Sequence, residues 1–263
     1  MTSAEATMLV RLQMTEGNGS STANSGSLGG SATIQSPGTW LADGPGIQQA
    51  INFGNDTSRT QGIFMNTGTA LQSLSQYTVT TWVKLNVGAG NTSGGDMIWN
   101  FTTSGDNTGS NGPDLFVLQG SSTQLDYHPG DYSGSNGDRV TTTNPWSDVT
   151  GVWQFLTLTF NAGAVTIYRG TESVAASSVA TVTATPTTTH PLPTLFELGG
   201  AASGWNVNTL AAAFGDFRIY DTALTPAQVE TVRQEAAVPE PGSATLLAFA
   251  GAALLARRAR RLA

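Results

Sequence analysis

Polar and apolar residues alternate along several short stretches of this chain, which is the pattern of β-strands that lie half-buried in a sheet. In Tyr77–Leu85 (YTVTTWVKL) most apolar side chains fall on one face and most threonines on the other. Trp153–Phe160 and Val165–Arg169 flank Asn161–Ala164, whose composition predicts a hairpin turn. Shorter runs that also predict strands are Met97–Phe101, Leu115–Leu118, Thr123–Tyr127, Leu195–Leu198 and Phe214–Tyr220.

One helix is predicted, at about Pro226–Gln234. Thr225 is the expected N-cap, a proline takes the first helical position, and Gln228 completes a capping box. Leu224 and Val229 stand at the two positions of a hydrophobic staple. Many short strands followed by one late helix predict an all-β sandwich or jelly roll.

The last 26 residues differ in composition from the rest of the chain. Val238–Gly242 contains two prolines, Ser243–Ala256 is an apolar run, and Arg257, Arg258, Arg260 and Arg261 follow. As a helix the run would reach about 21 Å, short of the roughly 30 Å of a hydrocarbon core. It therefore predicts a transient membrane contact held by cytoplasmic arginines, since a buried helix would not end in four arginines.

This tail resembles the PEP-CTERM sorting signal, because Val238 and the Pro239, Glu240 and Pro241 that follow it match the motif. The resemblance covers the tail alone. It implies recognition by an exosortase, a membrane transpeptidase, removal of the tail, and delivery to the surface of a Gram-negative-type bacterium. Export needs an N-terminal signal, and Met1–Leu12 has neither a basic region nor a long apolar run. We expect a leader upstream of this start, or a trimmed start.

Charge and composition narrow the classes of partner. Residues 1–242 carry seven Lys and Arg against 18 Asp and Glu, a net charge of −11, which argues against nucleic acid or anionic lipid. The chain has no cysteine, so it has no disulfide or thiolate metal site, and its two histidines cannot form a His-rich zinc site. The length suits one all-β domain at residues 1–236, with the sorting signal at 237–263.

Three segments follow one another as in laminin G-like, concanavalin A-like jelly rolls: Tyr77–Lys84, the tryptophan-led hairpin Trp153–Gly170, and Phe214–Thr225. Glu16–Gly19 and Asn24–Gly26 lie where that family has a Glu-Gly turn and an Asp-Ser-Gly loop, with an asparagine replacing the usual aspartate. The resemblance covers roughly residues 8–235. It implies a two-sheet antiparallel jelly-roll sandwich with paired first and last strands, one short C-terminal helix, and then a hydrophobic tail helix.

The resemblance also implies one structural Ca²⁺ near both termini. Residue by residue, it assigns carboxylate oxygens of Glu16 and Asp216 and backbone carbonyl oxygens of the loop Asn24–Gly26. Calcium takes six to eight oxygen ligands, so carbonyls and waters would complete the shell. The alternative is that Asp216 is simply solvated or paired with Arg218.

Two loop regions combine aromatic rings with carboxylates, as sugar-binding sites do. One is Asp126–Tyr132 and the other contains a tryptophan after Asn144-Pro145. The alternative is that these rings plug an open edge of the sandwich. The candidate ligand-binding residues are Tyr127, His128, Asp131, Tyr132 and Trp146.

Catalysis is not expected. Glycosidases need two carboxylates about 5–9.5 Å apart, and related jelly-roll glycosidases carry Glu-x-Asp-x-x-Glu on one strand, a run that this chain lacks. The expected strands are nearly free of carboxylates. We therefore expect a non-catalytic surface or matrix binding module for extracellular polysaccharide or a surface protein. The alternatives are a polysaccharide-active glycosidase or lyase and a structural surface-layer or biofilm component.

Overall fold

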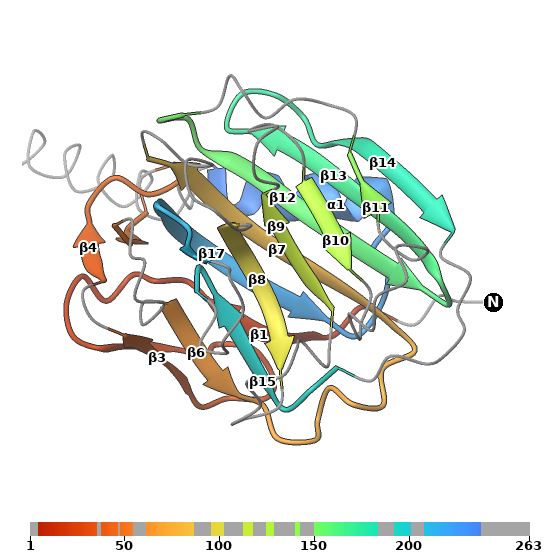
Figure 1. Ribbon diagram of the computed structural model, residues 1–263, viewed down its shortest axis with the longest axis horizontal. Helices are drawn as coiled ribbons and strands as arrows, with labels where there is room; N and C mark the ends of the chain where they lie inside the picture. Colours follow the sequence, from red (N-terminus) through yellow and green to blue (C-terminus); the bar gives the residue numbers. More distant parts are fainter. Residues whose placement is uncertain are drawn as a thin grey trace, which may run out of the picture.

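The computed structural model describes residues 5–35, 38–46, 48–54, 62–86, 96–102, 113–117, 125–128, 140–142, 150–183, 192–200 and 208–237. Strands in these residues form two sheets that pack face to face, and a single described helix lies on one of them (Figure 1). The predicted fold class, an all-β jelly-roll sandwich with one short C-terminal helix, is confirmed. The predicted tail helix lies outside the described residues.

The first sheet has eight strands, seven of them in one path. They are β1 (Met8–Leu12), β4 (Thr39–Leu41), β5 (Ala50–Asn52), β7 (Gln76–Leu85), β12 (Gln154–Asn161), β13 (Ala164–Thr171), β14 (Ser177–Thr183) and β17 (Ala212–Tyr220). The order is β14-β13-β12-β7-β17-β5-β4, and β1 pairs with β17. The first and last strands of the fold therefore lie side by side, as the family resemblance implied.

The second sheet has nine strands. They are β2 (Ser21–Ala23), β3 (Ser31–Gln35), β6 (Gly62–Asn66), β8 (Asp96–Thr102), β9 (Asp114–Val117), β10 (Leu125–His128), β11 (Val140–Thr141), β15 (Leu195–Leu198) and β16 (Asn208–Thr209). The order is β11-β10-β9-β8-β15-β6-β3-β2, and β16 pairs with β8. Sequence reasoning found the four central strands β8, β9, β10 and β15.

The core lies between the two sheets, where alternate residues of each strand meet. From β7, Tyr77, Val79 and Val83 are buried there, and Leu156 and Leu158 of the neighbouring β12 join them. Each such buried side chain stabilises the fold by about 1.5–3 kcal/mol relative to an exposed one. This burial fixes the register, because a slip by one residue would turn the apolar set outward.

A bulge in β17 changes the alternation of that strand. The pairing of β17 with β7 shifts between Gly215 and Arg218, and Asp216 between them has a left-handed φ of 38°. As a result Phe214 and Phe217, three residues apart, both reach the core between the sheets. Bulges change the direction of side chains in this way, and the residue inside this bulge, Asp216, carries a carboxylate.

The helix α1 (Pro226–Ala237) lies on the outer face of the eight-stranded sheet. Thr225 and Gln228 form the predicted capping box, because the backbone N–H of Thr225 donates to Gln228 Oε1 and that of Gln228 to Thr225 Oγ1. The staple residues Leu224 and Val229 are both buried against the outer face, together with Trp82. Among the described helical residues, none form a helix long and apolar enough to cross a membrane.

Candidate functional site

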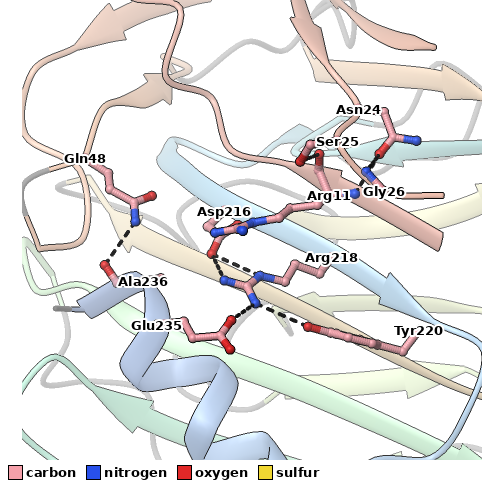
Figure 2. Close-up of polar contacts among 10 residues, drawn as sticks. All are labelled: Arg11, Asn24, Ser25, Gly26, Gln48, Asp216, Arg218, Tyr220, Glu235 and Ala236. Atoms are coloured by element: carbon pink, nitrogen blue, oxygen red, sulfur yellow. Dashed lines mark hydrogen bonds and ion pairs between the residues drawn. The ribbon is translucent and has the colours of Figure 1, made fainter. Parts of the chain in front are cut away.

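A network of charged side chains joins β1, β17 and the last turn of α1 (Figure 2). Asp216 Oδ1 accepts from Arg11 Nε at 3.0 Å, and Asp216 Oδ2 accepts from Arg218 Nε at 3.1 Å and Nη2 at 2.5 Å. Arg218 Nη1 also donates to Tyr220 Oη at 3.2 Å and to Glu235 Oε2 at 2.5 Å. We call these five residues the terminal ion network.

The centre of the terminal ion network is buried. Asp216 is 2% exposed and Arg218 is 1% exposed, so both charges are out of water. Burial alone would lower the pKa of Arg218, but the attraction and hydrogen bonds of Asp216 outweigh it and raise that pKa above its ordinary value. Arg218 therefore stays charged at every physiological pH, and its pairing with Asp216 offsets the cost of desolvating both groups.

The loop at Asn24 packs directly on β1. Asn24 Oδ1 accepts from the backbone N–H of Arg11 at 2.7 Å and from that of Gly26 at 2.8 Å. A Cβ at Gly26 would lie 2.4 Å from the carbonyl oxygen of Leu9, so only glycine fits there. Glu16 Oε1 accepts from the Ala23 backbone N–H at 2.7 Å and from a threonine hydroxyl.

Asp216, one of the residues assigned to calcium, does not fit a calcium ion as it is placed. Both oxygens of Asp216 face guanidinium groups, which repel a cation. The side-chain oxygen of Asn24 and one carboxylate oxygen of Glu16 each already accept two hydrogen bonds. In the described part of the chain, no group of three or more His, Cys, Asp or Glu could hold a metal ion. For Asp216 the structure shows the alternative expectation, an ion pair with Arg218.

The structure corrects the placement of Tyr127, which sequence reasoning assigned to a ligand-binding loop. Tyr127 lies inside β10, is 0% exposed, and packs near Trp99 with 6.3 Å between ring centroids. Its hydroxyl lies 3.0 Å from that of Tyr77 on the opposite sheet. This ring belongs to the core, because the strand continues through His128 instead of ending before a loop. Asp131, Tyr132 and Trp146 lie outside the described residues, as do Pro239, Glu240, Pro241 and Arg257, Arg258, Arg260 and Arg261.

A second candidate site lies on the outer face of the nine-stranded sheet. Glu197 on β15 pairs in register with Asn100 on β8, Asn100 with Asp114 on β9, and Asp114 with His128 on β10. We call these four positions the polar row. On the other side of Glu197, Phe64 of β6 continues the row. Residues more than 90 positions apart in the sequence thus lie at one level of one sheet.

Two members of the polar row lie on the face opposite the core. Asn100 lies between the core residues Trp99 and Phe101, and Glu197 between the core residues Phe196 and Leu198. In the next register level, Phe116 pairs with Met97 and with Asp126, and Asp126 with Thr141. Neighbouring strands of this sheet therefore contain acidic residues. Sequence reasoning had expected the acidic residues to lie in loops.

Two members of the polar row are deeply buried. Glu197 is 0% exposed and Asn100 is 2% exposed. Asn100 Oδ1 accepts no hydrogen bond from any residue that the structure describes. A buried acceptor left without a donor costs about 1–3 kcal/mol, so this atom marks a place where an added donor group would be stabilised.

Comparison with solved structures shows the same fold in bacterial toxins. The binding domain of botulinum neurotoxin serotype D is 13% identical, with a TM-score of 0.63, and the match covers 87% of this chain and 52% of that chain. The binding domain of botulinum neurotoxin DC, solved in complex with rat synaptotagmin II, is 11% identical, with a TM-score of 0.65, covering 88% and 52%. The binding domain of Paraclostridial Mosquitocidal Protein 1 is 12% identical, with a TM-score of 0.64, covering 86% and 52%.

The chain spans about half the length of these toxin binding domains, and at such identities the likeness concerns the fold alone. No curated protein sequence is similar enough to this chain to count as a match. Residues 55–230 match the family Laminin_G_3, described as the concanavalin A-like lectin/glucanases superfamily. This segment is more than half of the chain. It contains the central strands of both sheets and the strands that carry the polar row. The chain belongs to the concanavalin A-like lectin/glucanases superfamily.

Proposed function

We propose that this protein is an exported, surface-sorted binding module that holds an extracellular polysaccharide or a surface protein and has no chemistry of its own. The observation that carries the proposal is the polar row, which places Glu197 and Asn100 together on the outer face of the nine-stranded sheet. The outer face of the other sheet is covered by α1. Membership of a lectin-containing superfamily and the likeness to toxin binding domains support a binding role.

The route to the surface forms part of the proposal. The sequence motif at Pro239–Pro241 and the arginines near the end of the tail support sorting by an exosortase-type enzyme. The tail would make transient contact with the membrane. The described fold ends with α1 at Ala237, directly before this motif. Intact-mass measurement of surface-extracted protein tests the route: loss of Arg257–Arg261 supports it, and their retention contradicts it.

Affinity electrophoresis through gels that contain single extracellular polysaccharides tests the binding function. We expect retardation of the full chain by at least one polysaccharide, and less retardation of Glu197→Gln. The matched control is Asp43→Asn, which removes one negative charge from a side chain that is 76% exposed and far from the polar row in the sequence. Retardation by no polysaccharide, together with concentration-dependent self-association, would favour the structural alternative.

A hydrolase is the second candidate, because one observation favours it. Glu197 and Asp114 are two strands apart at one register level, which corresponds to roughly 10 Å between their Cα atoms. Inverting glycosidases hold their two carboxyl groups about 6.5–9.5 Å apart, and a Cα separation of this order leaves room for such a pair. Release of reducing ends from any polysaccharide that the chain binds, abolished by Glu197→Gln, would establish this candidate in place of the non-catalytic module.

A further inference from the structure

We propose that the folded domain controls the removal of its own tail, because the last turn of α1, residues 234–237, must open before an enzyme can cut at the motif that follows it. This inference rests on the proposed route to the surface and adds a regulatory step to that route. Three features carry it: the contacts that hold the end of α1, the short stretch of chain between α1 and the motif, and unsatisfied polar atoms on the sheet beneath the helix.

The last turn of α1 is held by side chains from other parts of the fold (Figure 2). Gln48 Nε2 donates to the carbonyl oxygen of Ala236 at 3.3 Å, and Arg218 Nη1 donates to Glu235 Oε2 at 2.5 Å. We call these the two end contacts. The helix contributes little to its own end, because its last turn has no basic residue and the residue after Ala237 is a valine instead of a capping glycine. Besides the packing of Ala236 on the sheet, the end contacts therefore determine how often this turn opens.

The motif follows the held turn almost directly in the sequence. Ala237 still belongs to α1, so only Val238 separates the helix from Pro239. An enzyme that binds a peptide in extended form, as a strand binds at a sheet edge, contacts several consecutive residues. Such a segment includes residues of the last turn, which must first leave the helix. When opening is fast relative to cleavage, the rate of cleavage follows the population of the open form.

The sheet surface beneath α1 favours this opening. Trp82 Nε1, Thr80 Oγ1 and Thr157 Oγ1 are buried and have no hydrogen-bond partner among the described residues. Trp82 belongs to the same apolar cluster as Val229 of α1, and Thr80 pairs in register with Thr157 on the same outer face. Buried polar atoms without partners cost free energy, and water that enters when α1 lifts would satisfy them. Opening therefore costs less than the loss of apolar packing alone would require.

The covalent step belongs to the sorting enzyme. The peptide bond at the motif breaks as its carbonyl carbon passes to a nucleophile of the enzyme, and the nitrogen of the released tail takes up a proton and leaves as an amine. The carbonyl carbon then passes to water or to an acceptor amine, which frees the enzyme. In this scheme α1 controls only the access of the enzyme to the chain.

The rate of tail removal tests the inference. It is measured by pulse-chase and intact mass for the full chain, exported behind a leader in a host that has an exosortase. Gln48→Glu replaces the donor amide by a carboxylate beside the Ala236 carbonyl, at the negative end of the helix dipole. We expect tail removal about fivefold faster, with faster amide exchange in residues 234–237.

Gln49→Glu is the matched control. It makes the same change of charge at the next residue, whose amide lies beside Gly17 and not beside α1: a Cβ at Gly17 would lie 2.8 Å from Gln49 Oε1. Both rates should stay at their native values in this variant. Thermal unfolding of each variant checks that it is folded.

A six-residue Gly-Ser insertion between Ala237 and Val238 removes the need for opening, because it supplies a flexible segment that an enzyme can bind. The chain with this insertion should lose its tail faster than the native chain. Gln48→Glu should then have no further effect on the rate, which separates access to the tail from any direct effect of the variant on the enzyme.

The other outcomes overturn the inference in distinguishable ways. Equal rates of tail removal in the native chain, in Gln48→Glu and in the chain with the insertion show that opening does not limit access, and they leave the proposed route standing. Unchanged amide exchange in Gln48→Glu shows that the end contacts do not hold the last turn. Retention of the tail in every chain, the one with the insertion included, overturns the proposed route and the inference with it.

Discussion

The hydroxyl groups of Tyr77 and Tyr127 meet in the core at 3.0 Å and link the two sheets of the sandwich. Tyr77 lies on β7 of one sheet and Tyr127 on β10 of the other, and their hydroxyls are buried. Burial raises the pKa of Tyr77 above its ordinary value, so it remains a neutral hydroxyl. The pair explains why two polar rings are tolerated between apolar faces.

Tyr127→Phe should lower the free energy of unfolding by about 1–3 kcal/mol, because it leaves the buried Tyr77 hydroxyl without this partner. Urea unfolding should show a lower midpoint with an unchanged slope. Binding of polysaccharide should be unaffected, since the ring lies in the core. Unchanged stability combined with lost binding would return Tyr127 to the ligand site.

Asp216→Ala should be among the most destabilising single changes, at about 3–5 kcal/mol, because it leaves the buried Arg218 charge without its main counterion. Glu235→Gln changes the exposed end of the same network, where the side chain is 51% exposed, and should cost less than about 1 kcal/mol. Chemical denaturation of both variants measures the difference. Equal losses would contradict a network whose stabilising part is buried.

Calcium should not stabilise the fold, because Arg11 and Arg218 surround the carboxylate of Asp216. Thermal unfolding of the full chain in excess EGTA and in millimolar calcium is the measurement. A bound ligand at a hundredfold excess over its Kd stabilises by about 2.7 kcal/mol, which raises Tm by several degrees. A rise of that size, lost in Glu16→Ala, would restore the calcium site that the family resemblance implies.

Acid should weaken the attachment of α1 through Glu230. The hydrogen bond from Arg233 is the main cause that lowers the pKa of Glu230 to about 2, from an ordinary value of 4.5. A carboxyl with a lowered pKa contributes stability above its unfolded pKa and loses it as the pH falls through its folded pKa. Between about pH 4.5 and 2 we therefore expect a loss of about 1 kcal/mol, because solvent screens this partly accessible pair. Comparing Tm of the native chain and of Glu230→Gln across this range is the test, and parallel curves would contradict it.

The long strands and the helix could be predicted because each carries its signal locally. β7 and β12 alternate over eight or more residues, and α1 begins with a capping box that reads directly from Thr225 and Gln228. The helix runs three residues past its predicted end at Gln234. Strands of three residues, such as β2 and β5, are too short to show a period and take their structure from their neighbours.

The polar row could not be predicted from local patterns. Asn100 and Glu197 are brought together only by the pairing of β8 with β15. No sequence pattern near either residue indicates that the other lies beside it. One available signal was the alternation itself: a polar residue between two core aromatics, as in Trp99-Asn100-Phe101, faces away from the core. The same rule places Tyr127 inward once β10 is extended to His128.

Hydrogen–deuterium exchange of the full chain, with and without a polysaccharide that retards it, tests the central claim most directly. The account predicts slower amide exchange on binding in residues 96–102, 113–117 and 195–198, which hold three members of the polar row. It predicts no change in residues 154–183, which form β12, β13 and β14 of the other sheet. Protection confined to 154–183, with none in the strands of the polar row, would contradict it.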